Sequence, residues 1–183
     1  MSIFDLRLET ERLLLRPPCA EDFEAFARFA GDAEATRHIG GAQSPPVAWR
    51  SLAALVGSWQ LQGFSMFSVI EKASGQWIGR IGPWQPYAWP GTEVGWSIGR
   101  EHWGKGYAPE AARAAIDWAF EQLGWTEVIH TIAADNANSK AVAAKLGSRY
   151  LRQGRLPEPH DQHEVEIWGQ SREDWRARHA ARP

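Results

Sequence analysis

The stretch that decides the fold is Arg100-Glu101-His102-Trp103-Gly104-Lys105-Gly106-Tyr107-Ala108-Pro109-Glu110. It follows a predicted strand over 92–98 and opens the clearest helical pattern of the chain, over 107–123. Glycines at 104 and 106 free backbone N–H groups and allow a ligand to approach the main chain closely. Because the N-terminus of a helix also favours negative charge, the stretch predicts a site for a phosphate or pyrophosphate.

Three interpretations of this stretch compete. The glycines can simply serve a tight turn. Residues 99–105 also read Gly-x-x-x-x-Gly-Lys, as in a nucleotide P-loop, but Gly106 stands where that motif needs a Ser or Thr for magnesium. The dinucleotide fingerprint fails because a third glycine is missing. The third interpretation, a loop that binds an acyl-CoA, is implied by the resemblance that follows.

Two sequence blocks carry a resemblance that favours this last interpretation. The first is Glu93-Val94-Gly95-Trp96-Ser97-Ile98 followed by Trp103-Gly104-Lys105-Gly106-Tyr107-Ala108-Pro109-Glu110-Ala111. The second is Asn136-Ala137-Asn138-Ser139 followed by Lys145-Leu146-Gly147. In type, spacing and order they resemble the GNAT superfamily, and within it the RimJ/RimL-like branch of ribosomal-protein N-terminal acetyltransferases. The likeness runs from about residue 8 to residue 175.

The resemblance implies a way of binding acetyl-CoA. The strands over 92–98 and 127–133 would part at their C-terminal ends in a V-shaped splay that receives the pantetheine arm. The pyrophosphate would lie on the backbone amides of residues 103–108. The cofactor-binding residues implied in this way are Trp96, Ser97, Ile98, Trp103, Gly104, Lys105, Gly106, Tyr107, Ala108, Asn136 and Ser139. Glu101 departs from the family pattern, which has Gln or Arg there, and a carboxylate does not help to bind an anion unless it faces solvent.

Acyl transfer to an amine requires a base, an oxyanion donor and a proton donor for the thiolate. We predict that Glu93 is the base, directly or through water, with a surface or ion-paired glutamate as the alternative. The resemblance implies a backbone N–H near Ile98 for the oxyanion. The family's usual tyrosine is replaced by Ala143, so the resemblance assigns proton donation to Ser139, whose alternative role is a helix cap.

Composition is compatible with this assignment. A chain of 183 residues ordinarily forms one domain, and we expect a single domain over 1–183. The formal charge of −2 implies no surface for nucleic acid, and no apolar run reaches membrane-spanning length. The single Cys19 excludes an internal disulfide framework and suits a reducing compartment, so a cytoplasmic location is expected. Eleven tryptophans indicate large apolar surfaces.

In chain order, the pattern predicts strands over 12–16, 66–71, 77–81, 92–98, 127–133, 149–153 and 163–168. Helices are expected near 23–31, 49–63, 107–123 and 139–146, with a short terminal helix from Ser171. Prolines are expected to keep 83–91 out of the sheet, and its aromatic residues form either a substrate wall or a loop folded on the core. The loop 37–46 is expected to be a solvated connection, with the border of a substrate cleft as the alternative.

Several polar residues are given structural roles. His160, Asp161 and His163 match no zinc pattern, so no metal site is expected. His130 is expected in the core or at an edge rather than in the cleft. Glu164 and Glu166 are expected on a solvated strand face, with attraction of a cationic amine as the alternative.

The sequence thus predicts an α/β (α+β) fold of the GNAT type, with a mixed, mostly antiparallel sheet of about six or seven strands. Helices should cover both faces, and the splay should separate the fourth and fifth strands. The predicted activity is acetyl-CoA-dependent transfer to a protein N-terminal amine or a small-molecule amine, with no metal, nucleic-acid or membrane partner. A homodimer is left open. A non-catalytic acyl-CoA-binding module and a P-loop phosphotransferase remain as alternatives.

Overall fold

The computed structural model describes residues 5–162 and 164–180 and contains one eight-stranded sheet in the order β1-β2-β3-β4-β5-β6-β8-β7. Every neighbouring pair is antiparallel except β5 and β6, which are parallel. The strands are β1 (Leu8–Glu9), β2 (Leu13–Arg16), β3 (Phe67–Glu71), β4 (Trp77–Trp84), β5 (Glu93–Ile98), β6 (Glu127–Ile132), β7 (Arg149–Arg155) and β8 (Glu164–Ser171). The predicted mixed, mostly antiparallel sheet is confirmed, with one short strand, β1, beyond the expected number.

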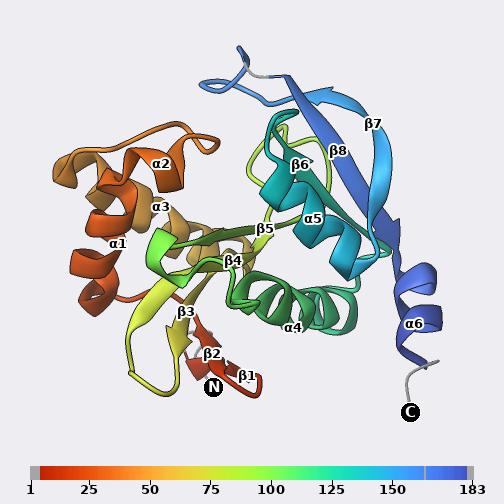
Figure 1. Cartoon of the computed structure of the whole chain (residues 1–183), viewed down its shortest axis with the longest axis horizontal. Helices are drawn as coiled ribbons and strands as arrows, with labels where there is room; N and C mark the ends of the chain where they lie inside the picture. Colours follow the sequence, from red (N-terminus) through yellow and green to blue (C-terminus); the bar gives the residue numbers. More distant parts are fainter. Residues whose placement is uncertain (1–4, 163, 181–183) are drawn as a thin grey trace.

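Six α-helices and two described 3-10 turns accompany the sheet (Figure 1). The helices are α1 (Phe23–Gly31), α2 (Ala33–Thr36), α3 (Pro45–Gln62), α4 (Tyr107–Gln122), α5 (Ala137–Leu146) and α6 (Arg172–Ala180). The 3-10 turns are η2 (Ala20–Asp22) and η3 (Arg100–His102). None of the helices in the described ranges has both the length and the apolar character needed to cross a membrane.

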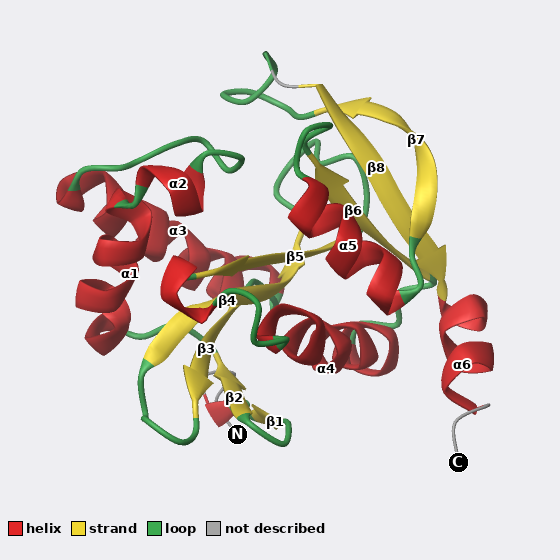
Figure 2. Ribbon diagram, viewed as in Figure 1, coloured by secondary structure: helices red, strands yellow, loops and turns green. Residues whose placement is uncertain are grey.

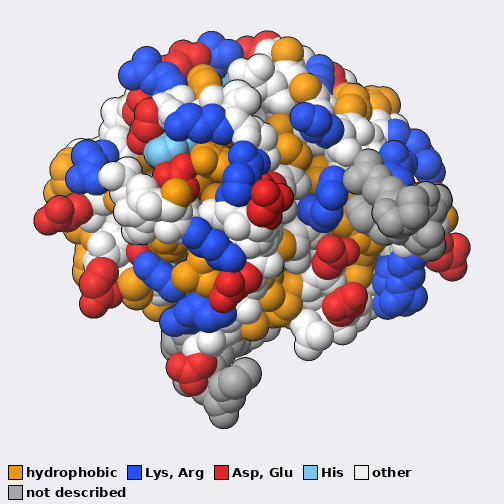
Figure 3. All heavy atoms as spheres, turned by 60° about the horizontal axis from the view of Figure 1, so that its bottom comes forward, with side chains coloured by type: hydrophobic (Ala, Val, Ile, Leu, Met, Phe, Trp, Pro, Cys, Tyr) orange, Lys and Arg blue, Asp and Glu red, His pale blue; other side chains and the backbone are white. Residues whose placement is uncertain are grey.

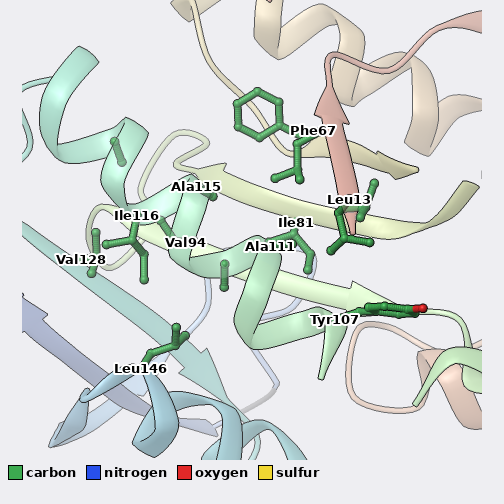
Figure 4. Close-up of a cluster of buried hydrophobic side chains, with 14 of the residues drawn as sticks. Leu13, Phe67, Ile81, Val94, Tyr107, Ala111, Ala115, Ile116, Val128 and Leu146 are labelled. Carbon is green, nitrogen blue, oxygen red and sulfur yellow. The ribbon is translucent and has the colours of Figure 1, made fainter. Parts of the chain in front are cut away.

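Helices lie on both faces of the sheet, as predicted. On one face, α4 buries alanines and Ile116 against β-strand residues such as Ile81 and Val94 (Figure 4). The small alanine side chains let α4 approach the strands closely. On the other face, α1 and α3 bury Phe26, Leu52 and their neighbours in a second cluster. The sheet is therefore covered by packed helices on both faces.

The region between β4 and β5 corrects one prediction. Prolines were expected to keep 83–91 out of the sheet, yet β4 extends through Pro83 to Trp84. Pro83 is opposite Val94 in the β4–β5 register, while the β3–β4 register ends at Phe67 and Ile81. The missing N–H of Pro83 therefore faces no β3 residue, and the strand loses no hydrogen bond.

The α5 helix begins two residues earlier than the predicted start at Ser139, because Asn136 is its N-cap. Gly147 ends α5 in the left-handed conformation, with φ of 89°. At the chain's other end, the amide of Asp174 donates to Oγ of Ser171, which confirms the capping role predicted for that serine. The strand predicted to begin at His163 begins at Glu164, and His163 itself lies outside the described residues.

Figure 2 shows β6, β8 and β7 running at a steep angle to β4 and β5. The β5–β6 pairing consists of one register pair, Glu93 opposite Ile129. The two strands therefore stop pairing immediately after Glu93, which is the splay predicted between the strands over 92–98 and 127–133.

Candidate active site

The glycine loop leads from η3 into the first turn of α4. Gly104 and Gly106 have φ of 75° and 79°, in the left-handed region that favours glycine. Within residues 5–162 and 164–180, no protein group accepts a hydrogen bond from the five amides of Gly104, Lys105, Gly106, Tyr107 and Ala108. These amides meet the positive end of the α4 dipole, so the loop is arranged to bind an anion.

The amide of Trp103 does not join this set. It donates to the carbonyl of Arg100 at 3.1 Å and closes the 3-10 turn. The indole Nε1 of Trp103 donates to the carbonyl of Ile98 at 2.7 Å. The prediction that Trp103 offers its amide to the cofactor is therefore wrong, because local turn formation uses that donor.

Arg12 holds the glycine loop from behind. Its Nη1 donates to the carbonyl of Lys105 at 2.9 Å, and its Nε donates to Oε2 of Glu110 at 2.7 Å. The guanidinium also lies over the ring of Tyr107, with 4.5 Å between Cζ and the ring centroid. Because the peptide bond is trans, a Lys105 carbonyl aimed at Arg12 turns the N–H of Gly106 to the opposite side. No local motif predicted this role, since Arg12 is far from the loop in sequence.

The side chains of the loop differ in exposure. Lys105 is exposed, whereas Tyr107 is buried and donates its hydroxyl proton to Glu71. Only the backbone of Tyr107 is therefore available to a ligand. The Glu101 side chain is 74% exposed and lies 3.7 Å from Nε2 of His102. The carboxylate that departs from the family pattern thus faces solvent.

The three β5 residues predicted to contact the pantetheine arm differ in which neighbouring strand their backbone N–H and C=O groups face. The carbonyl of Thr92 accepts from the amide of Ile129, while the amide of Gly99 donates to Ile78 of β4. Since alternate residues of a strand point to opposite neighbours, the backbone groups of Trp96 and Ile98 face the splay. Those of Ser97 face Arg80 on β4. A backbone contact from Ser97 to the cofactor is therefore excluded by the register, and its side chain is the part that remains available.

The splay is held open by a buried side-chain network. Nδ1 of His130 donates to the carbonyl of Val94 at 2.7 Å, and Nε2 accepts from Oγ of Ser148 at 2.9 Å. Gln170 donates to that serine oxygen at 2.9 Å. Burial lowers the pKa of His130 to about 4, although its bond to the Val94 carbonyl opposes this shift. The neutral imidazole of His130 thus donates to the carbonyl of Val94, which would otherwise accept from β6 if the β5–β6 pairing continued.

Glu93 lies at the point where the strands part. Its carboxylate accepts from the indole Nε1 of Trp89 and from the amide of Thr131 at 3.2 Å. Oγ1 of Thr131 lies 3.0 Å from Oε2. Burial raises the pKa of Glu93 to about 7, and these hydrogen bonds offset the effect only in part. Such a carboxyl group is suited to take up a proton near neutral pH; it is buried, and no described residue forms an ion pair with it.

Gly95 allows Glu93 and Met66 to pack closely over β5, where a larger residue would clash. A Cβ at Gly95 would lie 3.4 Å from Oε1 of Glu93 and 2.7 Å from Cε of Met66. Trp89 covers the carboxylate and contacts Trp84 edge-on, with ring centroids 6.3 Å apart. The aromatic segment over 84–89 thus meets the Glu93 site. Thr131 and Trp89 were not predicted as site residues. The sequence signal for Trp89 was the group of aromatic residues over 84–89, and Thr131 had no such signal.

The second sequence block forms the opposite side of the splay. Oδ1 of Asn136 accepts from the amide of Ser139 at 3.1 Å, so Asn136, and not Ser139, caps α5. Oγ of Ser139 accepts from the indole Nε1 of Trp96 at 3.3 Å. The Trp96 ring also stacks on His130, with centroids 4.6 Å apart. Because Ser139 accepts in this contact, its hydroxyl proton is free for another acceptor.

Of the remaining polar residues considered in the sequence, Glu164 and Glu166 form ion pairs within the protein. Nζ of Lys140 lies 2.8 Å from Oε1 of Glu166, and the indole Nε1 of Trp168 donates to Oε2 of the same carboxylate at 2.8 Å. Glu164 meets Arg155 at 3.3 Å on the exposed strand face. In the loop over 37–46, Nδ1 of His38 is 3.5 Å from Oδ1 of Asp135, so this loop contacts the turn before α5. Among the described residues, no group of three or more His, Cys, Asp or Glu side chains is placed to hold a metal ion.

Comparison with known proteins gives a family match over most of the chain. The model of the acetyltransferase (GNAT) domain matches residues 12–149. An uncharacterized N-acetyltransferase, p20 of Bacillus licheniformis, is 31% identical over 135 residues, which cover 72% of this chain and 76% of that protein. An acetyltransferase structure from Agrobacterium tumefaciens has a TM-score of 0.78 and 30% identity, and the match covers 91% of this chain and 95% of that one.

Ribosomal-protein acetyltransferases are among the structural neighbours. Mycobacterium smegmatis RimJ in complex with CoA-disulfide has a TM-score of 0.69 and 19% identity over 88% of this chain and 83% of that one. The ribosomal-protein-S5-alanine acetyltransferase from Vibrio fischeri has a TM-score of 0.73 and 20% identity over 93% of this chain and 99% of that one. At these identities the likeness shows a shared fold.

Proposed function

The chain belongs to the GNAT acetyltransferase family and is an acetyl-CoA-dependent N-acetyltransferase, and we propose that it acetylates a primary amine by direct attack on the thioester with Glu93 as the base. Membership in this family excludes the P-loop interpretation and favours catalysis over simple binding. The observation that carries the proposal is the buried Glu93 carboxylate, with its pKa raised to about 7 at the start of the splay.

The glycine loop is the proposed seat of the CoA pyrophosphate. Its unpaired amides at 104–108 and the α4 dipole supply donors and a favourable field, and the exposed Lys105 adds a positive charge. The pantetheine arm would follow the β5 edge, where the backbone groups of Trp96 and Ile98 face the splay. The side chains of Asn136 and Ser139 line the opposite border of this path.

The reaction follows from these positions. Glu93 accepts a proton from the acceptor ammonium, directly or through a water, and the free amine attacks the thioester carbonyl. The N–H of Ile98, which points into the splay, stabilises the oxyanion. The hydroxyl of Ser139 gives its proton to the departing thiolate. As the C–S bond breaks, the nitrogen of the tetrahedral intermediate loses its extra proton, which restores the Ser139 hydroxyl directly or through water. Glu93 releases its proton to solvent, so the net products are the amide, the CoA thiol and one proton.

We assign the whole of residues 1–183 to one catalytic domain. Its proposed working partners are acetyl-CoA and a protein N-terminal or small-molecule amine, in the cytoplasm. The proposal needs no metal. Whether two copies associate does not affect the chemistry, because all the residues invoked come from one chain.

An acceptor screen tests the proposal. Thiol release from acetyl-CoA is measured with N-terminal peptides, polyamines, amino acids and aminoglycosides, for the wild type and for Ser139→Ala. We expect at least one amine to accelerate release, and Ser139→Ala to lower kcat about tenfold or more with little change in the KM for acetyl-CoA. Full activity of Ser139→Ala would leave that residue no role in proton donation. Binding of CoA without release for any amine would contradict catalysis.

A further inference from the structure

A row of polar residues crosses the sheet on the face that carries Glu93. The register places Arg16 opposite Ser68, Ser68 opposite Arg80, and Arg80 opposite Ser97. Since directly paired residues of neighbouring strands share a face, all four side chains start on the side covered by α1. Ser97 and Glu93 are also on one face of β5, because four residues separate them. Arg80 therefore belongs to the same surface of the sheet as the proposed base.

Arg80 has no partner for its charge among the described residues. Its Nε is enclosed without a hydrogen-bond partner, and no ion pair or hydrogen bond involves its guanidinium. The contact it does make is with the ring of Phe26, at 5.8 Å from Cζ to the centroid. Burial alone lowers the pKa of Arg80 to about 10, with no carboxylate raising it. An unpaired, partly buried arginine is costly, so its charge calls for an anion from outside the chain.

Asp22, which contacts Arg16 and Ser68 of this row, does not pair with Arg80. Asp22 accepts from Nη1 and Nη2 of Arg16 at 2.9 and 2.6 Å, from Oγ of Ser68 at 2.7 Å and from the amide of Cys19 at 3.0 Å. These four bonds occupy both oxygens of Asp22 and pair it with Arg16. The row therefore carries one more positive than negative charge, and the surplus is at Arg80.

We propose that Arg80 binds a carboxylate of the acceptor, so that the substrate is a primary amine carrying a carboxylate several bonds from its nitrogen. The proposal rests on the function proposed above and narrows its substrate. Ser97, opposite Arg80 and before Ile98, offers a hydroxyl beside the same group. Arg80 is thus a specificity-determining residue, and Glu93 meets the amine end.

Spacing restricts the acceptor further. Glu93 and Ser97 are four residues apart in one strand, which separates their Cα atoms by about 13 Å. An α-amino acid holds its amine and carboxylate too close together to reach both Glu93 and Arg80. A peptide N-terminus with an acidic residue near its start, or a small ω-amino acid, has the required separation.

The experiment compares matched acceptors that differ only in the carboxylate. One pair is a Ser-Asp-Ala-Ala amide and a Ser-Asn-Ala-Ala amide, and the other is 5-aminopentanoate and pentylamine. The variants are Arg80→Gln, Arg80→Lys and a control, Arg50→Gln, at an exposed position of α3. The wild type and the control should prefer the acid of the better pair at least tenfold in kcat/KM, mainly through KM. Arg80→Gln should lose that preference, and Arg80→Lys should keep part of it.

A binding measurement separates this inference from the catalytic proposal. With CoA bound, the acid of the pair that responds, either the Ser-Asp-Ala-Ala amide or 5-aminopentanoate, should raise the Tm of the wild type and of Arg50→Gln, but not that of Arg80→Gln. Which pair responds distinguishes a peptide from a small molecule. Acetylation without any preference for the acid, or an equal preference in Arg80→Gln, overturns the role of Arg80 alone. Carboxylate binding that depends on Arg80, with no acetylation of any amine, contradicts the catalytic proposal instead.

Discussion

At the scale of single residues, the chemistry depends on how Glu93 is enclosed. Three donors from Trp89 and Thr131 surround its carboxylate, yet none of them carries a full positive charge. Burial therefore dominates and raises the pKa of Glu93 to about 7. A carboxyl group with an ordinary pKa would be a weaker base towards an ammonium, because the driving force for proton uptake would be smaller.

Replacing Glu93 by Gln should lower kcat by roughly a hundredfold or more. The wild-type rate should rise with pH through about 7 and then level, because the base acts only when ionised. Glu93→Gln should lose that rise while its Kd for acetyl-CoA stays unchanged. Steady-state rates between pH 5.5 and 9 and calorimetric titration with CoA measure both. A wild-type pH profile retained in the variant would remove Glu93 from the mechanism.

At the scale of elements, the glycine loop and the splay are built by contacts from outside them. Arg12 of the turn before β2 fixes the loop, and His130 of β6 takes the carbonyl of Val94. The contact with Arg12 keeps the carbonyl of Lys105 from turning towards the ligand side. The contact with His130 occupies the carbonyl of Val94, so β6 does not pair with β5 beyond Glu93. The ligand-binding backbone is thus organised before a ligand arrives.

Gly104→Ala should weaken CoA binding roughly tenfold or more, because the left-handed conformation that exposes the amides becomes costly. Gly124→Ala is a matched control, since Gly124 has φ of 69° and Gly104 has φ of 75°. A Cβ at either position meets no atom within 4 Å. Both variants should lose similar stability, about 1 kcal/mol. Equal Kd values for CoA in the two variants, by calorimetry, would show that the loop conformation is not required.

The stability of the folded protein should depend on pH through the protonation of His130. In the folded state burial lowers the pKa of His130 to about 4, so protonation favours the unfolded chain. The stability that His130 contributes is present above its unfolded pKa of about 6.5 and is lost as pH falls towards 4. His130→Gln does not titrate, so its Tm should approach that of the wild type between pH 7 and 4. A constant difference in Tm across this range would contradict the buried, neutral state of His130.

At the scale of the whole molecule, Figure 3 shows Lys and Arg side chains interspersed with Asp and Glu side chains over one face. Binding is therefore determined by local sites rather than by a field of one sign, in line with the formal charge of −2. Binding of the acceptor is likewise inferred to depend on a local site, the single unpaired charge of Arg80. The sheet joins both sites, because β5 carries Glu93 on one side and leads into the glycine loop at its end.

Sequence patterns predicted the helices well where periodicity and glycine stops were clear, as for α1 and α4. The end of α3 was also predicted, but the helix begins at Pro45, four residues before the expected start and inside the expected loop, because proline is compatible with the first turn of a helix. The patterns also placed the splay between the correct strands through the family resemblance. The extension of β4 through Pro83 was missed, because tolerance of proline depends on which neighbour its missing N–H faces. Arg12, Thr131 and Arg80 were missed for a related reason. Their roles arise from sheet register and contacts between distant segments, which no local pattern encodes.

The central claim is that the unpaired amides of the glycine loop bind the diphosphate of CoA. Backbone amide NMR during titration tests it directly, with CoA compared with pantetheine, which lacks the pyrophosphate. The amide signals of Gly104, Lys105 and Gly106 should shift downfield with CoA and stay in place with pantetheine, while those of Trp96 and Ile98 move with both. Loop signals that ignore CoA, or that respond equally to pantetheine, would contradict the claim.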